Sequence, residues 1–233
     1  MTTFPVSESI QTQERGANRI DGPVWKRNNS IMSRLLPLFP LQLVVFPGTA
    51  VPLHIFEERY REMVGEAEAA GTEFGIVLAK DEGILSIGCA VSVEAVLHRY
   101  PDGRFDVMTR GQRRFTIMSL DREKAYLRGE VEYFEDDDWT PVTPELRSRA
   151  MKAFEQMSEA AAPDPEHPLL SFQLAQAVDD LGFKAAFQRI RSESKRLQHF
   201  VEFMDSYIPI QQYAAKMKRA APMNGSGHKP ASL

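Results

Sequence analysis

The stretch LLPLFPLQLVVFPGTAVPLHIFEERYREMV, residues 35–64, decides the fold of this 233-residue chain. Its first part is apolar but carries three prolines, and proline cannot donate to a sheet ladder, so we expect short edge strands and turns there. A helix over about residues 56–70 should follow, ending near Gly71. Its apolar face would comprise Phe56, Tyr60, Met63, Val64 and Ala67.

Residues 74–134 carry strand patterns. The continuous apolar run FGIVLA, residues 74–79, predicts a strand buried on both faces. Because inward residues stay at odd positions across the segments RYPDGR and RGQRR, we expect each to be a loop of odd length or to carry a bulge. The inward sets are Ile87, Cys89, Val91, Val93, Ala95 and Leu97; then Phe105, Val107 and Thr109; then Phe115 and Ile117; and finally Ala125, Leu127, Gly129, Val131 and Tyr133.

After an acidic linker, residues 135–143, the apolar spacing becomes helical. We expect Gly182 to end one helix and Pro209 to interrupt the last one. The helical faces are Leu146, Ala150, Ala153, Phe154 and Met157; Leu170, Leu174, Ala177, Val178 and Leu181; Phe183, Phe187 and Ile190; and Leu197, Phe200, Val201 and Met204. A β-rich lobe followed by an all-α lobe belongs to the α+β class.

The predicted organisation has four parts. A polar arm, residues 1–33, lacks periodicity and is expected to be disordered, with Phe4, Val24 and Trp25 as its candidate anchors. The β-rich lobe spans 34–138, the helical lobe 139–219, and a flexible tail 220–233. Both lobes are small, so we expect them to bury a face against each other and move as one unit. The helix at 56–70 is the expected contact, with Trp139 holding the linker against it.

Composition limits the function. A net charge of −4 and an isoelectric point near 5.8 disfavour a nucleic-acid partner, which would require a basic face. The single cysteine, Cys89, cannot form an intramolecular disulfide and falls on an inward strand face, which favours an inert thiol. The N-terminus lacks a secretory pattern, and no apolar run has the length of a membrane span. We therefore expect a cytoplasmic protein without a membrane partner.

Catalytic chemistry is absent from the sequence patterns. There is no GxxxxGK[ST], GxGxxG, HExxH, GxSxG or CxxC motif. None of the five histidines stands at ligand spacing from another histidine or from Cys89. Ser194 and Lys195 are neighbours on a predicted helix, so they point about 100° apart and cannot form a dyad with each other. We expect no catalytic residue, no cofactor and no metal.

The opening stretch also carries a family resemblance. The segments LPLFPL (36–41), VVFPG (44–48), PL (52–53) and IFEERYREM (55–63) resemble the start of the LON substrate-binding domain of the Lon protease family. FGIVLA, IGCAVSVEAV, PDGRFDVMTRGQRRFTI and YLRGEVE follow in that family's order, so the resemblance covers about residues 34–213.

The resemblance implies a PUA-like β pseudo-barrel with one helix, followed by a helical lobe, and a role in polypeptide recognition. The ATPase and Ser-Lys peptidase that follow in full-length Lon have no counterpart in this sequence, so unfolding and proteolysis are not implied. The expected function is a non-catalytic module that binds unfolded or tagged polypeptides, with a Lon-type ATP-dependent protease as a candidate partner.

The candidate binding surface is the cleft between the lobes or an exposed strand edge. Candidate contacts are Met108 and Met118, whose positions are opposite in parity to the core, and Arg110, Arg113 and Arg114, expected to form a basic turn. The methionines could equally pack under the helical lobe, and the turn could be solvated. Two alternatives stay open, an RNA-binding PUA-like protein and an enzyme whose site would be a deep polar pocket holding a titratable pair.

Overall fold

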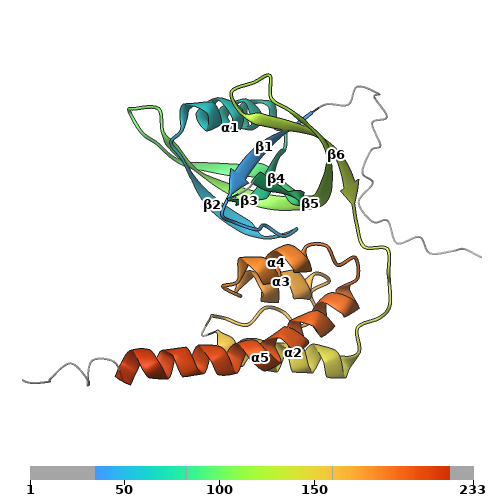
Figure 1. The fold of residues 1–233 in the computed structure, drawn as a ribbon. Helices are drawn as coiled ribbons and strands as arrows, with labels where there is room; N and C mark the ends of the chain where they lie inside the picture. The colour runs from blue at the N-terminus through green and yellow to red at the C-terminus, as the bar shows by residue number, and fades with distance from the viewer. Residues whose placement is uncertain (1–34, 82, 159, 221–233) are drawn as a thin grey trace, which may run out of the picture. The chain divides into compact units, whose positions relative to one another are not determined.

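The computed structural model describes residues 35–81, 83–158 and 160–220 (Figure 1). The predicted arm, with Phe4, Val24 and Trp25, and residues 221–233 of the predicted tail lie outside the described residues. A β-rich lobe precedes a helical lobe, which confirms the α+β prediction. The elements are β1 Leu36–Leu41, β2 Ala50–Ile55, α1 Glu58–Ala70, β3 Phe74–Lys80, β4 Gly83–Arg99, β5 Phe105–Asp121, β6 Leu127–Phe134, α2 Pro144–Met157, α3 Leu170–Gln176, α4 Leu181–Phe187 and α5 Glu193–Ala220.

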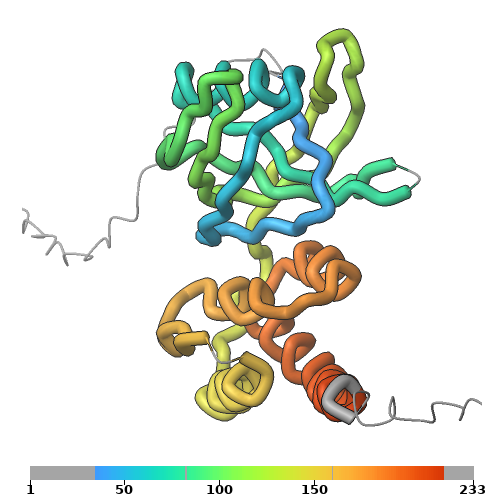
Figure 2. Tube along the Cα trace, turned by 90° about the vertical axis from the view of Figure 1, so that its left-hand side faces the viewer, coloured from blue at the N-terminus to red at the C-terminus, as the bar shows by residue number. Residues whose placement is uncertain are grey.

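The six strands close on themselves. Their order is β2-β5-β4-β3-β1-β6, and β6 also pairs with β5. β1 and β3 are parallel, and the other pairs are antiparallel. The first half of the long strand β5 pairs with β2 and its second half with β6, so β5 closes the barrel seen in Figure 2. β2 pairs with β5 alone among the described strands and forms the edge of the sheet.

The prolines of β1 do not mark an edge strand. Residues 36–38 pair with β6 and residues 38–41 pair with β3. Pro37 therefore has a partner only in β6 and Pro40 only in β3, so each proline interrupts a single ladder. The edge prediction is therefore wrong for β1. The edge strand is β2, which follows that stretch and carries Pro52.

The predicted basic turn at RGQRR is also wrong, because β5 runs through it without a break. Val91 pairs with Gly111 and Ala90 with Arg113, which leaves Gln112 as a bulge, the other alternative drawn from the parity of the pattern. Gly48 N donates to Gly111 O at 2.8 Å, and Gly111 N donates to Thr49 O at 2.9 Å. A Cβ on Gly111 would collide with the carbonyl of Phe46, so the crossing of residues 46–49 requires glycine there.

Bulges also change the alternation of β4. Its register against β5 shifts after Val93 and again after Val96. Val96 packs on the core instead of Ala95, and Leu97 is 55% exposed, so the inward prediction fails for these last two positions. The RYPDGR loop is odd in length as predicted, because Arg99 pairs with Phe105 and leaves residues 100–104 between them.

Helix α1 packs on the barrel largely as predicted. It ends at Gly71, whose φ of 60° is left-handed, and it buries Tyr60, Met63, Val64 and Ala67. The rings of Tyr60 and Phe39 lie 4.1 Å apart. Phe56 is the exception: it precedes the helix and is 59% exposed, so it does not attach α1 to the barrel.

The helical lobe differs from expectation at two breaks. The chain leaves helix after α3 and re-enters at Asp180, which caps α4 by accepting from Phe183 N at 2.7 Å, so Gly182 lies inside α4. α5 is 28 residues long and continues through Pro209 without a break. Proline removes one helical hydrogen bond, and Pro209 is exposed, so the helix can accommodate its ring.

The two lobes share a hydrophobic core. Val44, Phe46 and Leu78 of the β lobe join the buried side chains of α2–α5, and the rings of Phe46 and Phe172 stack at 5.2 Å. The predicted contact through α1 is wrong, because α1 buries its apolar face in the separate barrel core. Trp139 is 79% exposed and does not hold the linker.

Ion pairs hold the linker instead. Asp136 accepts from Arg114 of β5 at 2.6 Å and from both terminal nitrogens of Arg196 of α5 at 2.6 and 2.7 Å. Both arginines are buried, and Arg114 also donates to the carbonyls of Gln188 and Ile190. Glu193 provides a second carboxylate, 2.7 Å from Arg196. We call Arg114, Asp136, Glu193 and Arg196 the linker latch.

Asp136→Asn should destabilise the protein by about 3–5 kcal/mol, because it removes the shared counter-charge of two buried guanidinium groups. Urea unfolding measures the loss. Asp137→Asn is the matched control, since its ion pair with Arg191 is exposed and should contribute less than about 1 kcal/mol. Equal losses for the two variants would contradict the importance of the latch.

The latch should also weaken in acid. Burial acts to raise the pKa of Asp136, but the hydrogen bonds and charges of Arg196 and Arg114 outweigh it and hold the pKa below its usual value. A depressed folded-state pKa contributes stability above the unfolded value, near about 4, and this is lost as pH falls through the folded pKa. The stability difference between wild type and Asp136→Asn should therefore be constant from pH 7 to about 5 and shrink below about 4.

Candidate functional site

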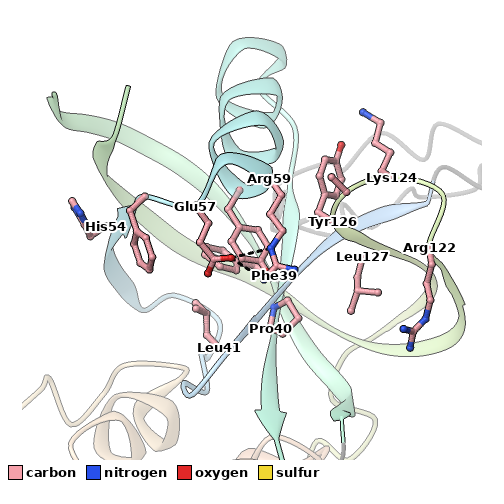
Figure 3. Close-up of a pocket in the computed structure, with 13 residues that line it drawn as sticks. Phe39, Pro40, Leu41, His54, Glu57, Arg59, Arg122, Lys124, Tyr126 and Leu127 are labelled. Carbon is pink, nitrogen blue, oxygen red and sulfur yellow. Dashed lines mark hydrogen bonds and ion pairs between the residues drawn. The ribbon is translucent and has the colours of Figure 1, made fainter. Parts of the chain in front are cut away.

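A hollow of about 500 Å³ opens in the β lobe where α1 begins (Figure 3). It lies between β1, the end of β2, the first turn of α1 and the segment leading into β6. We call it the lip pocket. Its lining residues are Phe39, Pro40, Leu41, His54, Phe56, Glu57, Arg59, Tyr60, Arg122, Lys124, Ala125, Tyr126 and Leu127.

The floor of the lip pocket is apolar and the rim carries an exposed aromatic ring. Phe39 and Tyr60 are buried beneath it, at 6% exposure each. Phe56 stands at the rim with 59% of its surface exposed, its ring stacked 5.9 Å from that of His54. A large exposed ring beside an apolar hollow is typical of a binding surface rather than of a core.

The charged rim residues are largely paired. Arg59 contacts Glu57 at 2.8 Å and lies 4.6 Å from the ring centroid of Tyr60. Lys124 lies 3.1 Å from Glu66, and hydrogen bonding with Tyr126 and Glu66 raises the pKa of Lys124, so it stays an ammonium group. Two of the three cationic rim residues are therefore paired, while Arg122 forms no ion pair with another described residue.

One titratable pair adjoins the pocket. His54 Nδ1 lies 2.5 Å from Asp106 Oδ1, and Tyr100 donates to Asp106 Oδ2 at 2.9 Å. Hydrogen bonds from His54 and Tyr100 hold the pKa of Asp106 below its usual value. Such a pair can orient a general base, and the thirteen lining residues include no serine, threonine or cysteine beside it.

A strip of solvent-facing residues continues from the pocket across three strands. Pro52 and His54 lie on one face of β2, and their cross-strand partners in β5 are Met108 and Asp106. Met108 is paired in turn with Ala95 of β4. We call these five residues the β2 face. The other edge of β2 pairs with none of the described strands.

The five candidate contacts lie along β5 and do not form one patch. Met108 lies on the β2 face, half-buried, and Met118 is 60% exposed ten residues further on. A strand rises about 3.3 Å per residue, so the path along β5 between the two methionines is at most about 33 Å. Met118 is too exposed to pack beneath the helical lobe, and the binding role of both methionines stays a prediction.

The three arginines have separate partners. Arg110 pairs with Glu94 across the strands, and Arg113 pairs with Glu73 at 3.0 Å while stacking 3.7 Å from the ring centroid of Tyr133. Arg114 is 3% exposed and belongs to the linker latch, so its assignment to an exposed basic turn is wrong. Binding roles for Arg110 and Arg113 stay predictions.

Sequence reasoning missed Phe56 as a surface residue. Its spacing fitted the helical face of α1, but it also continues the outward alternation of Ala50, Pro52 and His54 in β2. The two-residue alternation of β2 was therefore the sequence signal that could have placed Phe56 on the surface.

Within the described ranges, none of the helices is both long and apolar enough to cross a membrane. The buried thiol of Cys89 has its pKa raised to about 12, chiefly by burial, as suits an inert core residue.

Comparison with known proteins agrees with this architecture. The sequence model of the ATP-dependent protease La (LON) substrate-binding domain matches residues 35–213. Lon protease from Flavobacterium johnsoniae is 25% identical over 146 residues, covering 55% of this chain and 18% of that protein. The chain spans about a fifth of the length of the curated relatives it matches.

Two solved structures are similar in fold. The Lon N-terminal domain protein from Xanthomonas campestris is 27% identical with a TM-score of 0.62, and the match covers 73% of this chain and 99% of that one. The N-terminal domain of the Mycobacterium avium complex Lon protease has a TM-score of 0.52 at 14% identity, covering 74% and 99%.

The exposure of Phe56 predicts that it is dispensable for folding. Phe56→Ser should change the free energy of unfolding by less than about 0.5 kcal/mol. Tyr60→Ser, four residues along, should cost about 3 kcal/mol or more, because it removes a buried ring from the barrel core. Thermal and urea unfolding of both variants would check this, and a large loss for Phe56→Ser would show that the ring is packed.

Proposed function

Because the chain belongs to the family of the ATP-dependent protease La (LON) substrate-binding domain, we propose that it is a non-catalytic module that binds unfolded or tagged polypeptides at the lip pocket and the β2 face. The exposed ring of Phe56 beside an apolar-floored hollow of about 500 Å³ is the observation that carries this proposal. A folded protein offers few free apolar side chains, whereas an unfolded chain offers many.

The surface matches an extended chain in two ways. The lip pocket has room for one or two apolar side chains, which gain about 1.5–3 kcal/mol each when fully buried. The edge of β2 that has no partner among the described strands can pair with the backbone of the same segment by strand addition. Met108 on the β2 face has a flexible thioether that suits varied side chains.

The paired rim charges argue against RNA as the ligand. Nucleic-acid affinity comes mainly from cations that are free to replace counterions at phosphates. Arg59 and Lys124 at the pocket are already matched by Glu57 and Glu66, which leaves Arg122 as the one other arginine or lysine among the lining residues.

We further propose that the bound polypeptide is passed to a Lon-type ATP-dependent protease. The support is the family itself, since the curated relatives that match this chain are named Lon proteases. A reducing compartment such as the cytoplasm suits a chain whose single cysteine is a buried free thiol.

Titration with a fluorescently labelled, permanently unfolded protein, such as reduced and carboxymethylated α-lactalbumin, tests the proposal. Phe56→Ser should weaken binding about 10-fold or more, because one large apolar contact is lost. Met108→Ser should weaken it severalfold. Leu120→Ser is the matched control, since Leu120 is 43% exposed on β5 but lies outside the pocket and the β2 face.

Failure of the wild-type chain to bind at tens of micromolar would overturn the proposal. An equal loss for Leu120→Ser and Phe56→Ser would leave the binding but remove the site assignment.

A further inference from the structure

The lip pocket is more positive than the chain as a whole. Among its lining side chains, Arg59, Arg122 and Lys124 are cationic, and Glu57 is the single carboxylate. The whole chain, in contrast, carries a net charge of −4. A positive site on an acidic protein favours ligands that bring a negative group. Which negative group it suits depends on the cations that are not already paired.

Two of the three cations are occupied by neighbouring carboxylates. Arg59 contacts Glu57 at 2.8 Å. Lys124 lies 3.1 Å from Glu66 and 3.5 Å from Glu62. A ligand would have to compete with these partners, so Arg59 and Lys124 contribute little to its recognition.

The local alternation of the chain leaves Arg122 without a counter-charge. Its neighbours Asp121 and Glu123 are both acidic, but both pair with Arg128, at 2.6 and 3.2 Å. Arg122 and Lys124, which alternate with them, line the lip pocket instead. Arg122 is exposed and forms no ion pair with another described residue. Its guanidinium group is therefore available to a ligand in the pocket.

Arg122 shares the hollow with the apolar floor. Figure 3 shows Arg122 on the Leu127 side of the pocket, with the side chain of Lys124 pointing away from Pro40. Phe39 lies in the floor and is 6% exposed. An extended polypeptide rises about 3.3 Å per residue. A chain that places an apolar side chain on the floor therefore brings the groups one or two residues further along to the side where Arg122 lies.

We propose that the lip pocket prefers polypeptide segments in which a carboxylate stands within two residues of a large apolar side chain, and that Arg122 pairs with this carboxylate. The inference rests on the proposed function and names the class of segment that the pocket selects. The planar fork of a guanidinium group can donate to both oxygens of a carboxylate at once. The carboxylate can belong to an acidic side chain or to the C-terminal end of a chain, since both present the same group.

One free guanidinium group suits this role better than the binding of nucleic acid. Affinity for nucleic acid depends on several phosphates being neutralised together. An exposed ion pair changes affinity by a factor of up to about five and is screened by salt. We therefore expect Arg122 to rank segments that the apolar floor already holds, and not to hold a segment by itself.

Competition on the full chain tests the proposal, with the labelled unfolded α-lactalbumin as the displaced ligand. The first competitor is an unlabelled glycine-serine peptide with a central Leu-Phe-Glu and both ends blocked. It should displace the labelled protein at a concentration about three- to fivefold lower than its Leu-Phe-Gln counterpart. Raising the salt from about 0.02 to about 0.5 M should remove most of this difference, because it shortens the range of the charge interaction.

Two further peptides separate the sources of the carboxylate. Both end in Leu-Phe, one with a free C-terminal carboxylate and the other with an amide. An advantage of the free acid as large as that of Glu over Gln would support recognition of either source. An advantage confined to one peptide pair would support the proposal for that source alone.

Substitution of Arg122 assigns the preference to this residue. Arg122→Gln should displace equally with the Glu and Gln peptides while still binding unfolded α-lactalbumin within about fivefold of the wild type. Arg149→Gln is the matched control, since it removes the same charge from an exposed position on α2, outside the pocket, and should keep the preference. Both side chains are exposed, so both variants should melt within about 2 °C of the wild type.

The possible failures are distinguishable. Equal displacement of the wild type by the Glu and Gln peptides, or displacement by neither, would overturn the carboxylate preference and leave polypeptide binding in place. A preference that persists in Arg122→Gln would overturn the role of Arg122. A wild-type chain that does not bind the labelled α-lactalbumin would overturn the proposed function, and this inference with it.

Discussion

A single carboxylate, Asp136, lies between two buried guanidinium groups, and the arrangement of the two lobes depends on it. Arg114 reaches it from the middle of β5 and Arg196 from the start of α5. Burying two positive charges is costly unless a negative group is shared between them, so the linker must follow the path that brings Asp136 there. The acidic composition of the linker is therefore structural: Asp137 and Asp138 also pair, with Arg191 and Lys195.

The long strand β5 connects this latch to the candidate site. Met108 and Asp106 lie near its start on the β2 face, while Arg114 lies past the Gln112 bulge, in the latch. The Gln112 bulge thus lies between Met108, which is half-buried on the β2 face, and Arg114, which is buried in the latch. The β lobe that forms the lip pocket is thus joined to the helical lobe through Arg114 of β5, although no residue of the helical lobe lines the pocket.

The sequence predicted the elements where one periodicity acted alone. β3, the inward residues Cys89, Val91 and Val93 of β4, and the ending of α1 at Gly71 followed directly from local pattern. The predictions from sequence failed where long-range contacts decide the structure. Arg114 was expected to be exposed because it is charged, but it is buried and paired with Asp136. Gly111 was expected in a turn, but it lies within β5, where residues 46–49 cross it. Phe56 was misplaced because it satisfied the strand and helix periods at once. The candidate site was therefore the least predictable part, since it lies where elements meet.

The crossing segment at residues 44–49 has a consequence for synthesis. Val44 and Phe46 belong to the β lobe, between β1 and β2, yet they are buried by helices that lie more than a hundred residues later in the chain. The carbonyl of Val45 likewise accepts a hydrogen bond from the side-chain amide of Gln188, which is synthesised much later. A ribosome-bound chain that has completed its barrel still displays these apolar side chains until α3–α5 emerge. For much of its translation, a protein of a substrate-binding family thus exposes the same kind of surface that such a domain is proposed to recognise in others.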